Sequence, residues 1–291
     1  DDYESDSKGL YTKIIKKFGD NTEFGITFEN YQKESESSTK PENLTGSYIS
    51  AVNEADSERT RISIDFDYAS SEDSTFDLIK GSLYFNEMDY ENSYKERTLS
   101  DGTDNDHDLE QDTYGVNLQF SNELMVGKAR NLFSYGLEAS KFNGMRTARD
   151  YAPNSEGIYE LKSGYPQKTV PETDVSKYGI YLQNEYSLGD LEIIGGIRYD
   201  YYDLDSIKDD DWLREGSTRR FVNPRTAVPD PVDISARSFN PHLAAILKVN
   251  EDTSIYGKYS RGFRAPTWEE LNSSHFNIFG PANGAGYATF G

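Results

Sequence analysis

The spacing of β-strand patterns constrains this chain more than any single residue, because short and long connections alternate along it. Apolar side chains at every second position predict about ten strands. They cover residues 9–18, 22–31, 58–69, 75–90, 111–126, 131–143, 175–188, 190–204, 236–249 and 253–262. Joints within successive pairs are short, as at Gly19-Asp20-Asn21, whereas those between pairs are long: 32–57, 91–110, 144–174 and 205–235. An antiparallel meander follows, with its short turns at one end.

The predicted strands each have one apolar and one polar face, because side chains alternate across a strand. The residues expected to point outward, away from the polar side, are Ile62, Ile64, Phe66, Val116, Leu118, Ile180, Leu182, Leu243, Ala245 and Leu247. Those expected to point inward are Asp65, Asn117, Gln183 and His242. Something must cover the apolar side, and the sequence contains no amphipathic helix for that task.

The composition of the chain indicates what covers the apolar side of the strands. Only 35% of the residues are hydrophobic and no apolar run reaches the length of a transmembrane helix, yet 22 Tyr and 15 Phe are too many for a disordered chain. A barrel wall in a membrane reconciles these facts, since only alternate residues face lipid. We therefore predict an all-β fold: part of a transmembrane antiparallel β-barrel with short periplasmic turns and long extracellular loops.

Several classes of function are disfavoured by the same composition. A net charge of −21 argues against nucleic acid as a partner, because phosphates would be repelled. The chain has no Cys, so disulfides and thiolate metal sites are excluded. It has no nucleophile elbow, phosphate-binding glycine loop or HExxH motif, and we predict that it is not an enzyme. No signal peptide begins at Asp1, as expected of a mature or trimmed chain.

The densest acidic stretch runs over residues 101–108. Its Asp104-x-Asp106-x-Asp108 spacing resembles a calcium loop, but an EF-hand places Gly next, where this chain has Leu109. We interpret the stretch as a solvated loop tip, with a calcium site as the alternative. His107, within it, is expected to be solvated.

From Val175 onward the chain resembles TonB-dependent outer-membrane receptors. The similar segments are Tyr178-Gly179-Ile180-Tyr181-Leu182-Gln183-Asn184-Glu185, Gly195-Gly196-Ile197-Arg198-Tyr199-Asp200, Phe239-Asn240-Pro241-His242-Leu243-Ala244 and Tyr256 to Pro266, read YGKYSRGFRAP. His242 stands where that family usually has a basic residue, and alternation makes it a structural residue of the lumen. The resemblance implies a protein of the Gram-negative cell outer membrane that takes up a ligand.

Within that superfamily, the stretch FRAPTWEELNSSHF over residues 263–276 resembles the haem and haemoglobin receptor branch. There a FRAP box precedes an extracellular loop whose His ligates haem iron, and an NPNL box follows; this chain reaches Gly291 without one. The resemblance implies that His275 is an axial ligand of haem iron. Neutral imidazole suits that role.

Three further residues of this stretch are haem-binding candidates. Phe263 and Phe276 are placed to stack on a porphyrin face, with packing of the loop as the alternative. Arg264 is the third, and it is also expected to pair with Glu270 by hydrogen bonds at the barrel wall.

The resemblance also implies how the whole protein is organised. Residues 1–291 are expected to form a partial receptor barrel, without the plug domain, the TonB box or the remaining C-terminal strands. Expected partners are haem or a haemoprotein as transported ligand, the TonB complex through the absent plug, and outer-membrane lipid. The alternatives are a siderophore receptor of the same fold and, from another class, a soluble or secreted β-rich binding or adhesion protein.

Overall fold

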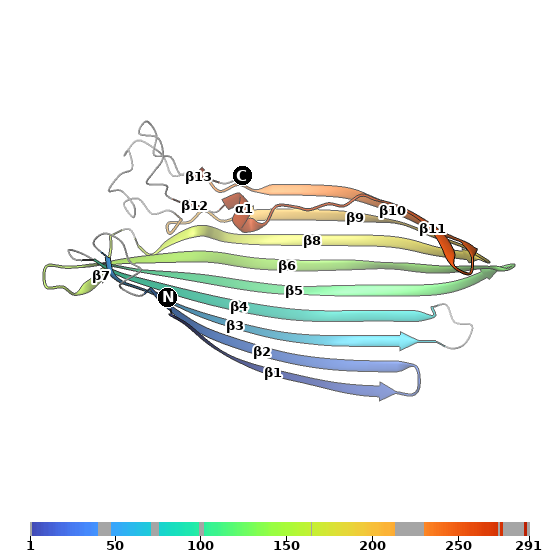
Figure 1. The fold of residues 1–291 in the computed structure, drawn as a ribbon, viewed down its shortest axis with the longest axis horizontal. Coiled ribbons are helices and arrows are strands. Elements are labelled where there is room, and N and C mark those ends of the chain that lie inside the picture. Colours follow the sequence, from blue (N-terminus) through green and yellow to red (C-terminus); the bar gives the residue numbers. More distant parts are fainter. Residues whose placement is uncertain are drawn as a thin grey trace.

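The computed structural model describes residues 2–39, 48–70, 76–98, 102–163, 165–212, 230–272, 274–275 and 288–289 (Figure 1). Strands dominate them. The first six are β1 (Asp2–Phe18), β2 (Thr22–Thr39), β3 (Tyr48–Ala69), β4 (Leu78–Thr98), β5 (Gly102–Val126) and β6 (Ala129–Pro153). They are followed by β7 (Tyr159–Leu161), β8 (Gln167–Leu188), β9 (Leu191–Ser206), β10 (Ile234–Asn250) and β11 (Thr253–Ser260). The remaining elements are α1 (Trp268–Asn272), β12 (Ser274–His275) and β13 (Ala288–Thr289).

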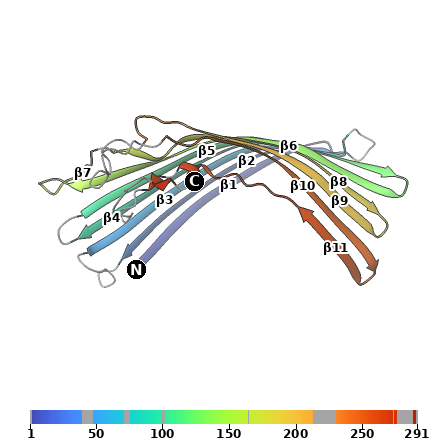
Figure 2. The ribbon, with the colours of Figure 1, turned by 90° about the horizontal axis from the view of Figure 1, so that it is seen from above.

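Strands β1 to β11 form one sheet in which each long strand pairs antiparallel with the next along the chain. The short β7 lies off this path and pairs with β6. The sheet is strongly curved, so that it forms an arch with a convex and a concave face (Figure 2). The predicted meander is confirmed. Within the described residues, no helix is long and apolar enough to span a membrane.

The short turns lie together at one end of the arch (Figure 1). Gly19, Gly127 and Gly189 begin three of them with φ of 65°, 63° and 58°. These left-handed conformations suit glycine because it has no Cβ to clash with the backbone. The loops that begin at Gly127 and Gly189 have two residues, and such loops match the twist of the strands that they join. The loop at Gly19 has three residues, and in each case the turn sets the hairpin register.

The apolar side chains predicted to point outward occupy the convex face. Cross-strand pairs such as Ile64 with Leu83 and Leu182 with Ile197 keep them on that face from strand to strand. In most long strands this apolar band gives way to polar residues after a few positions: Phe28 then Asn30, Ile62 then Thr60, Phe85 then Glu87, Tyr114 then Asp112, Ala139 then Lys141, Tyr201 then Asp203, and Phe239 then Arg237. A band of this kind is the lipid-contacting surface of a membrane barrel.

The predicted long loops were wrong in extent, because strands continue well beyond the apolar band. β5 begins at Gly102 and β6 ends at Pro153. On the side of the apolar band away from the short turns, β5 contains residues 102–112. At about 3.4 Å per residue, they add about 35 Å of strand. Polar side chains on both faces of these extensions tolerate water, and the ladder satisfies the backbone. Polar composition alone therefore predicted loops where the structure has strands.

From Gly102 onward the acidic stretch is part of this extension and not a loop tip, while Asp101 lies outside the described residues. Asp104 pairs with Arg97, and Asp108 pairs with Arg149. In the described residues, no group of three or more His, Asp or Glu side chains is placed to hold a metal ion. The calcium alternative therefore finds no support in the strand geometry, because arginines occupy two of its carboxylates.

The prediction that His107 is solvated was also wrong. It lies in the interior of β5, paired with Asn92 and Ala148 on the neighbouring strands. Its Nδ1 is buried and has no hydrogen-bond partner among the described residues. Burial lowers the pKa of His107, and the nearby Arg146 lowers it further. Both effects favour the neutral form of the ring.

Candidate functional site

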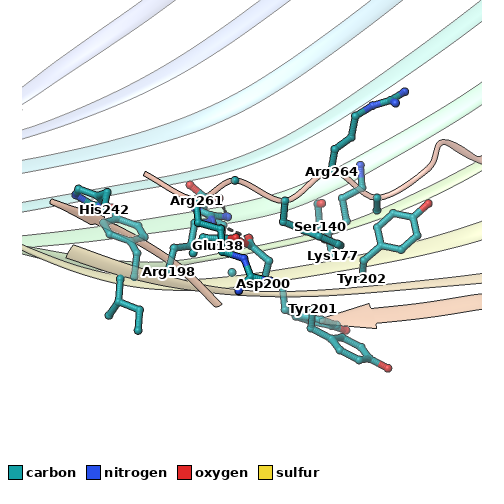
Figure 3. A pocket seen from close by; sticks show the side chains of 18 of the residues that line it. Glu138, Ser140, Lys177, Arg198, Asp200, Tyr201, Tyr202, His242, Arg261 and Arg264 are labelled. Atoms are coloured by element: carbon teal, nitrogen blue, oxygen red, sulfur yellow. Dashed lines mark hydrogen bonds and ion pairs between the residues drawn. The ribbon is translucent and has the colours of Figure 1, made fainter. Parts of the chain in front are cut away.

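A large cavity lies on the concave face, between the wall and residues 261–267 (Figure 3). After β11 the chain leaves the sheet and crosses the hollow of the arch (Figure 2). The cavity has a volume of about 1410 Å³, and its lining includes Glu138, Lys177, Arg198 and His242. Cavities of this size are large enough for an organic ligand.

The floor of the cavity is a network of paired charges. Arg198 on β9 donates to Glu138 on β6 at 2.6 Å and to Asp200 at 2.7 Å. Asn240 on β10 donates to the second oxygen of Asp200 at 2.8 Å. A Cβ at Gly179 would collide with the Arg198 guanidinium, so the glycine between Glu138 and Asp200 makes room for it. The network ties three strands together and leaves its carboxylates largely satisfied.

His242 and Gln183 lie beside this network, toward the short turns. The imidazole Nε2 of His242 is 3.0 Å from the amide oxygen of Gln183. Gly196, between them in the register, has no Cβ, and a Cβ there would meet the ring of His242. Both residues were predicted to face the lumen as part of the wall. Their position on the concave face confirms that orientation.

The segment that covers the cavity is fastened at both ends. Near its start, the backbone N–H of Arg261 donates to the carbonyl oxygen of Pro241 at 3.0 Å. Near its end, the hydroxyl of Tyr202 donates to the carbonyl oxygen of Pro266 at 2.8 Å. Tyr202 is buried on β9. Pro266 has no backbone N–H and cannot pair as an inner strand residue does, which favours this departure from the sheet.

A capping box begins α1 directly after the proline. The backbone N–H of Glu270 donates to the Thr267 hydroxyl at 3.2 Å, and the N–H of Thr267 donates to the Glu270 carboxylate at 2.8 Å. This reciprocal pair starts a helix because it satisfies N–H groups that have no partner within it. Glu270 also accepts from Arg264. The Thr267 N–H and the Arg264 guanidinium together lower the pKa of Glu270.

The short helix α1 is docked at the end of the wall opposite the short turns. Trp268 is buried with a cluster on β8 and β9, formed by Val170, Val175, Tyr202 and Leu204. Its ring centroid lies 5.5 Å from that of Phe142 on β6. Asn272, at the end of the helix, is buried and donates to the hydroxyl of Ser206 at 2.8 Å. The chain is therefore anchored three residues before His275.

The structure brings some of the predicted site residues together. Phe263 and Arg264 both line the cavity, and the expected pairing of Arg264 with Glu270 is present. The backbone of His275 in β12 pairs with Ala288 in β13, and β12 lies beside β8. Phe276 lies outside the described residues.

Sequence reasoning missed the anchors of this site. The Thr267-x-x-Glu270 spacing is a capping-box signature and was visible in the sequence. Tyr202, Trp268 and Asn272 carried no comparable signal, because their roles depend on which strand the helix contacts. Some charges of the cavity are paired, as between Arg198 and the carboxylates of Glu138 and Asp200, and its lining comes from several strands and one covering segment.

The fold and the concave site together are those of an outer-membrane receptor barrel, and comparison with known proteins agrees. Residues 2–291 match the family described as TonB dependent receptor-like, beta-barrel. The chain belongs to this family. It is a protein of the cell outer membrane, and its convex apolar band faces lipid. The alternative of a soluble or secreted adhesion protein is therefore wrong.

Among curated proteins, the chain is similar to a hemin receptor of Yersinia pestis, with 26% identity over 174 residues. This match covers 58% of the chain and 20% of that receptor, so the chain spans a small part of its length.

Solved structures show the same fold. The hemophore receptor HasR of Serratia marcescens, in complex with its hemophore HasA and heme, has a TM-score of 0.63 at 17% identity, over 92% of this chain and 38% of HasR. The ferric citrate transporter FecA has a TM-score of 0.56 at 12% identity, over 87% of this chain and 35% of FecA.

Proposed function

We propose that this chain is part of the barrel wall of a receptor that takes up haem, free or carried by a protein, across the outer membrane. The observation that carries the proposal is the anchoring of α1, which fixes the chain just before His275 at the end of the wall opposite the short turns. The short turns of such barrels are periplasmic, so this end is extracellular. The similarity to a hemin receptor supports haem as the ligand.

His275 would act as an axial ligand of the haem iron. Neutral imidazole binds haem iron well, and His275 follows α1 at the end of the wall that this proposal makes extracellular. Phe263, on the covering segment, is 37% exposed and is available to contact a flat porphyrin. Arg264 is held by Glu270 and would present its free guanidinium edge to the ligand. Phe276 remains a proposed contact on the strength of the motif alone.

The complete receptor would contain more than this chain. The coverage of HasR and of the hemin receptor supports further strands and a plug domain outside residues 1–291. The function would then be uptake and not catalysis. The ligand would bind at the extracellular end, and the TonB complex would act through the plug. The second haem ligand would come from that part of the protein.

The test is His275→Ala in the full-length receptor, with His107→Asn as the matched control. Titration with haem followed at the Soret band should show a large loss of affinity and a shifted band for His275→Ala only. Barrel assembly should be unchanged, since His275 follows the docked helix and lies outside the sheet formed by β1 to β11.

Unchanged haem binding, together with unchanged growth on haem as sole iron source, would reject the ligand role. A ferric siderophore would then be the better candidate for the ligand, and a panel of ferric chelates would identify it by the same titration.

A further inference from the structure

The cavity under residues 261–267 differs in charge from the rest of the chain. Five cationic side chains line it, Lys177, Arg198, Lys258, Arg261 and Arg264, against three anionic ones, Glu138, Asp200 and Glu269. The lining thus has a positive surplus in a chain whose net charge is −21. A concave surface with one sign of charge and walls of low dielectric concentrates counter-ions of the opposite sign.

Three of these cations differ from the others because they have no ion-pair partner among the described residues. In the part of the chain that the structure describes, Lys177, Lys258 and Arg261 have no carboxylate within ion-pairing distance. The chain has 21 more acidic than basic residues, so the absence of ion pairs at these three cations does not reflect a shortage of carboxylates. Elsewhere on the concave face the wall does pair its cations, as between Lys13 and Asp65 and between Lys80 and Asp67.

Two of the three acidic residues of the cavity do not compensate these cations. Glu138 and Asp200 are engaged by Arg198 and Asn240. Lys177 has Ser140 on one side and Tyr202 on the other as its cross-strand neighbours, and its ammonium lies 5.9 Å from the centre of the Tyr202 ring. Figure 3 shows Lys177, Ser140 and Tyr202 grouped at one end of the cavity and Arg261 near Glu138 and Arg198.

We infer that this cavity is an anion subsite that receives the carboxylate groups of the imported compound. Lys177 and Arg261 are its principal contacts, and the Ser140 hydroxyl is an additional donor. The inference rests on the proposed function, and it names the part of the ligand that this wall binds: the carboxylate arms of an iron porphyrin. Charge-assisted hydrogen bonds to a carboxylate are stronger than neutral ones.

The experiment compares haem with its dimethyl ester, which keeps the iron and the ring but has no free carboxylates. Both are titrated into the full-length receptor in detergent. Wild type should bind the ester about ten- to hundredfold more weakly than haem. The double variant Lys177→Gln/Arg261→Gln should lose most of that preference, because haem affinity falls while ester affinity is unchanged.

The matched control is Lys248→Gln. Lys248 lies on β10, on the same face as His242 by alternation, but it does not line the cavity. This variant should keep the wild-type ratio of haem affinity to ester affinity.

A wild-type ratio of these affinities in the double variant would overturn the inference while leaving haem uptake standing. If wild type binds neither compound, the proposed function fails first, and His275→Ala would show no effect either.

Discussion

The hydroxyl of Tyr202 on β9 lies 2.8 Å from the carbonyl oxygen of Pro266, and this bond fastens the end of the segment that covers the cavity to the barrel wall. The two residues are 64 positions apart in the chain. The bond holds the proline that precedes the capping box of α1. It therefore couples the wall of the barrel to the position of the helix and of the chain beyond it.

Tyr202→Phe should loosen the covering segment without affecting the barrel. The variant keeps the buried ring and loses one hydrogen bond, which is worth about 1 kcal/mol. Hydrogen exchange of the amides in 261–267 should become faster, and haem affinity should fall slightly. Tyr199→Phe is the control, because Tyr199 belongs to the convex face. Equal exchange rates in the two variants would show that the Tyr202 hydroxyl has no holding role.

The docking of α1 should weaken in acid. The pKa of Glu270 is lowered by the Thr267 N–H and by Arg264, from an ordinary value of 4.5. A lowered folded-state pKa contributes stability above the ordinary value, and that contribution is lost as pH falls through the folded value. Protection of the α1 amides should therefore be constant from pH 7 to about 5 and decrease below about 4.5.

Glu270→Gln provides the comparison for this pH dependence. Its amide can still accept from Thr267 but does not titrate, so protection in the variant should be lower at pH 7 and flatter across the acidic range. A wild-type profile that matches the variant would separate α1 docking from the charge of Glu270.

Charge on the convex face should destabilise the barrel. Leu182→Arg places a cation in the apolar band, at a cost of about 2–4 kcal/mol near mid-bilayer. Asn117→Arg, on the concave face, should cost much less because its side chain faces the lumen. Urea unfolding of the full-length receptor in lipid vesicles measures both. Similar losses at the two sites would contradict the assignment of the faces.

The chain expressed alone should not form a monodisperse barrel in detergent. Strands β1 and β11 each pair on one side only within the described sheet. Open strand edges are not tolerated in hydrocarbon and promote association in water. We expect aggregates on size exclusion, and a well-folded monomer when the flanking parts of the receptor are present. A stable monomer from residues 1–291 alone would refute this expectation.

The alternation of residues along the strands determined the membrane-facing side of this protein. Ile64, Leu182 and Leu243 were assignable to the lipid side because a strand has a strict period of two and lipid tolerates only apolar side chains over the band. The same rule placed Gln183 and His242 inside. Glycine marked where three of the hairpins reverse, since positive φ is a local property of the backbone.

Local pattern did not determine how far the strands extend or what the segment after β11 does. The stretch over 102–110 reads as a solvated loop because its side chains are polar, yet it pairs with neighbours on both sides, and only the neighbouring strands supply those hydrogen bonds. The burial of the His107 Nδ1 atom and of Trp268, the room that Gly179 leaves for Arg198, and the bond from Tyr202 to Pro266 all depend on residues distant in the chain. Such contacts depend on strand register and sheet curvature, which are properties of the whole sheet.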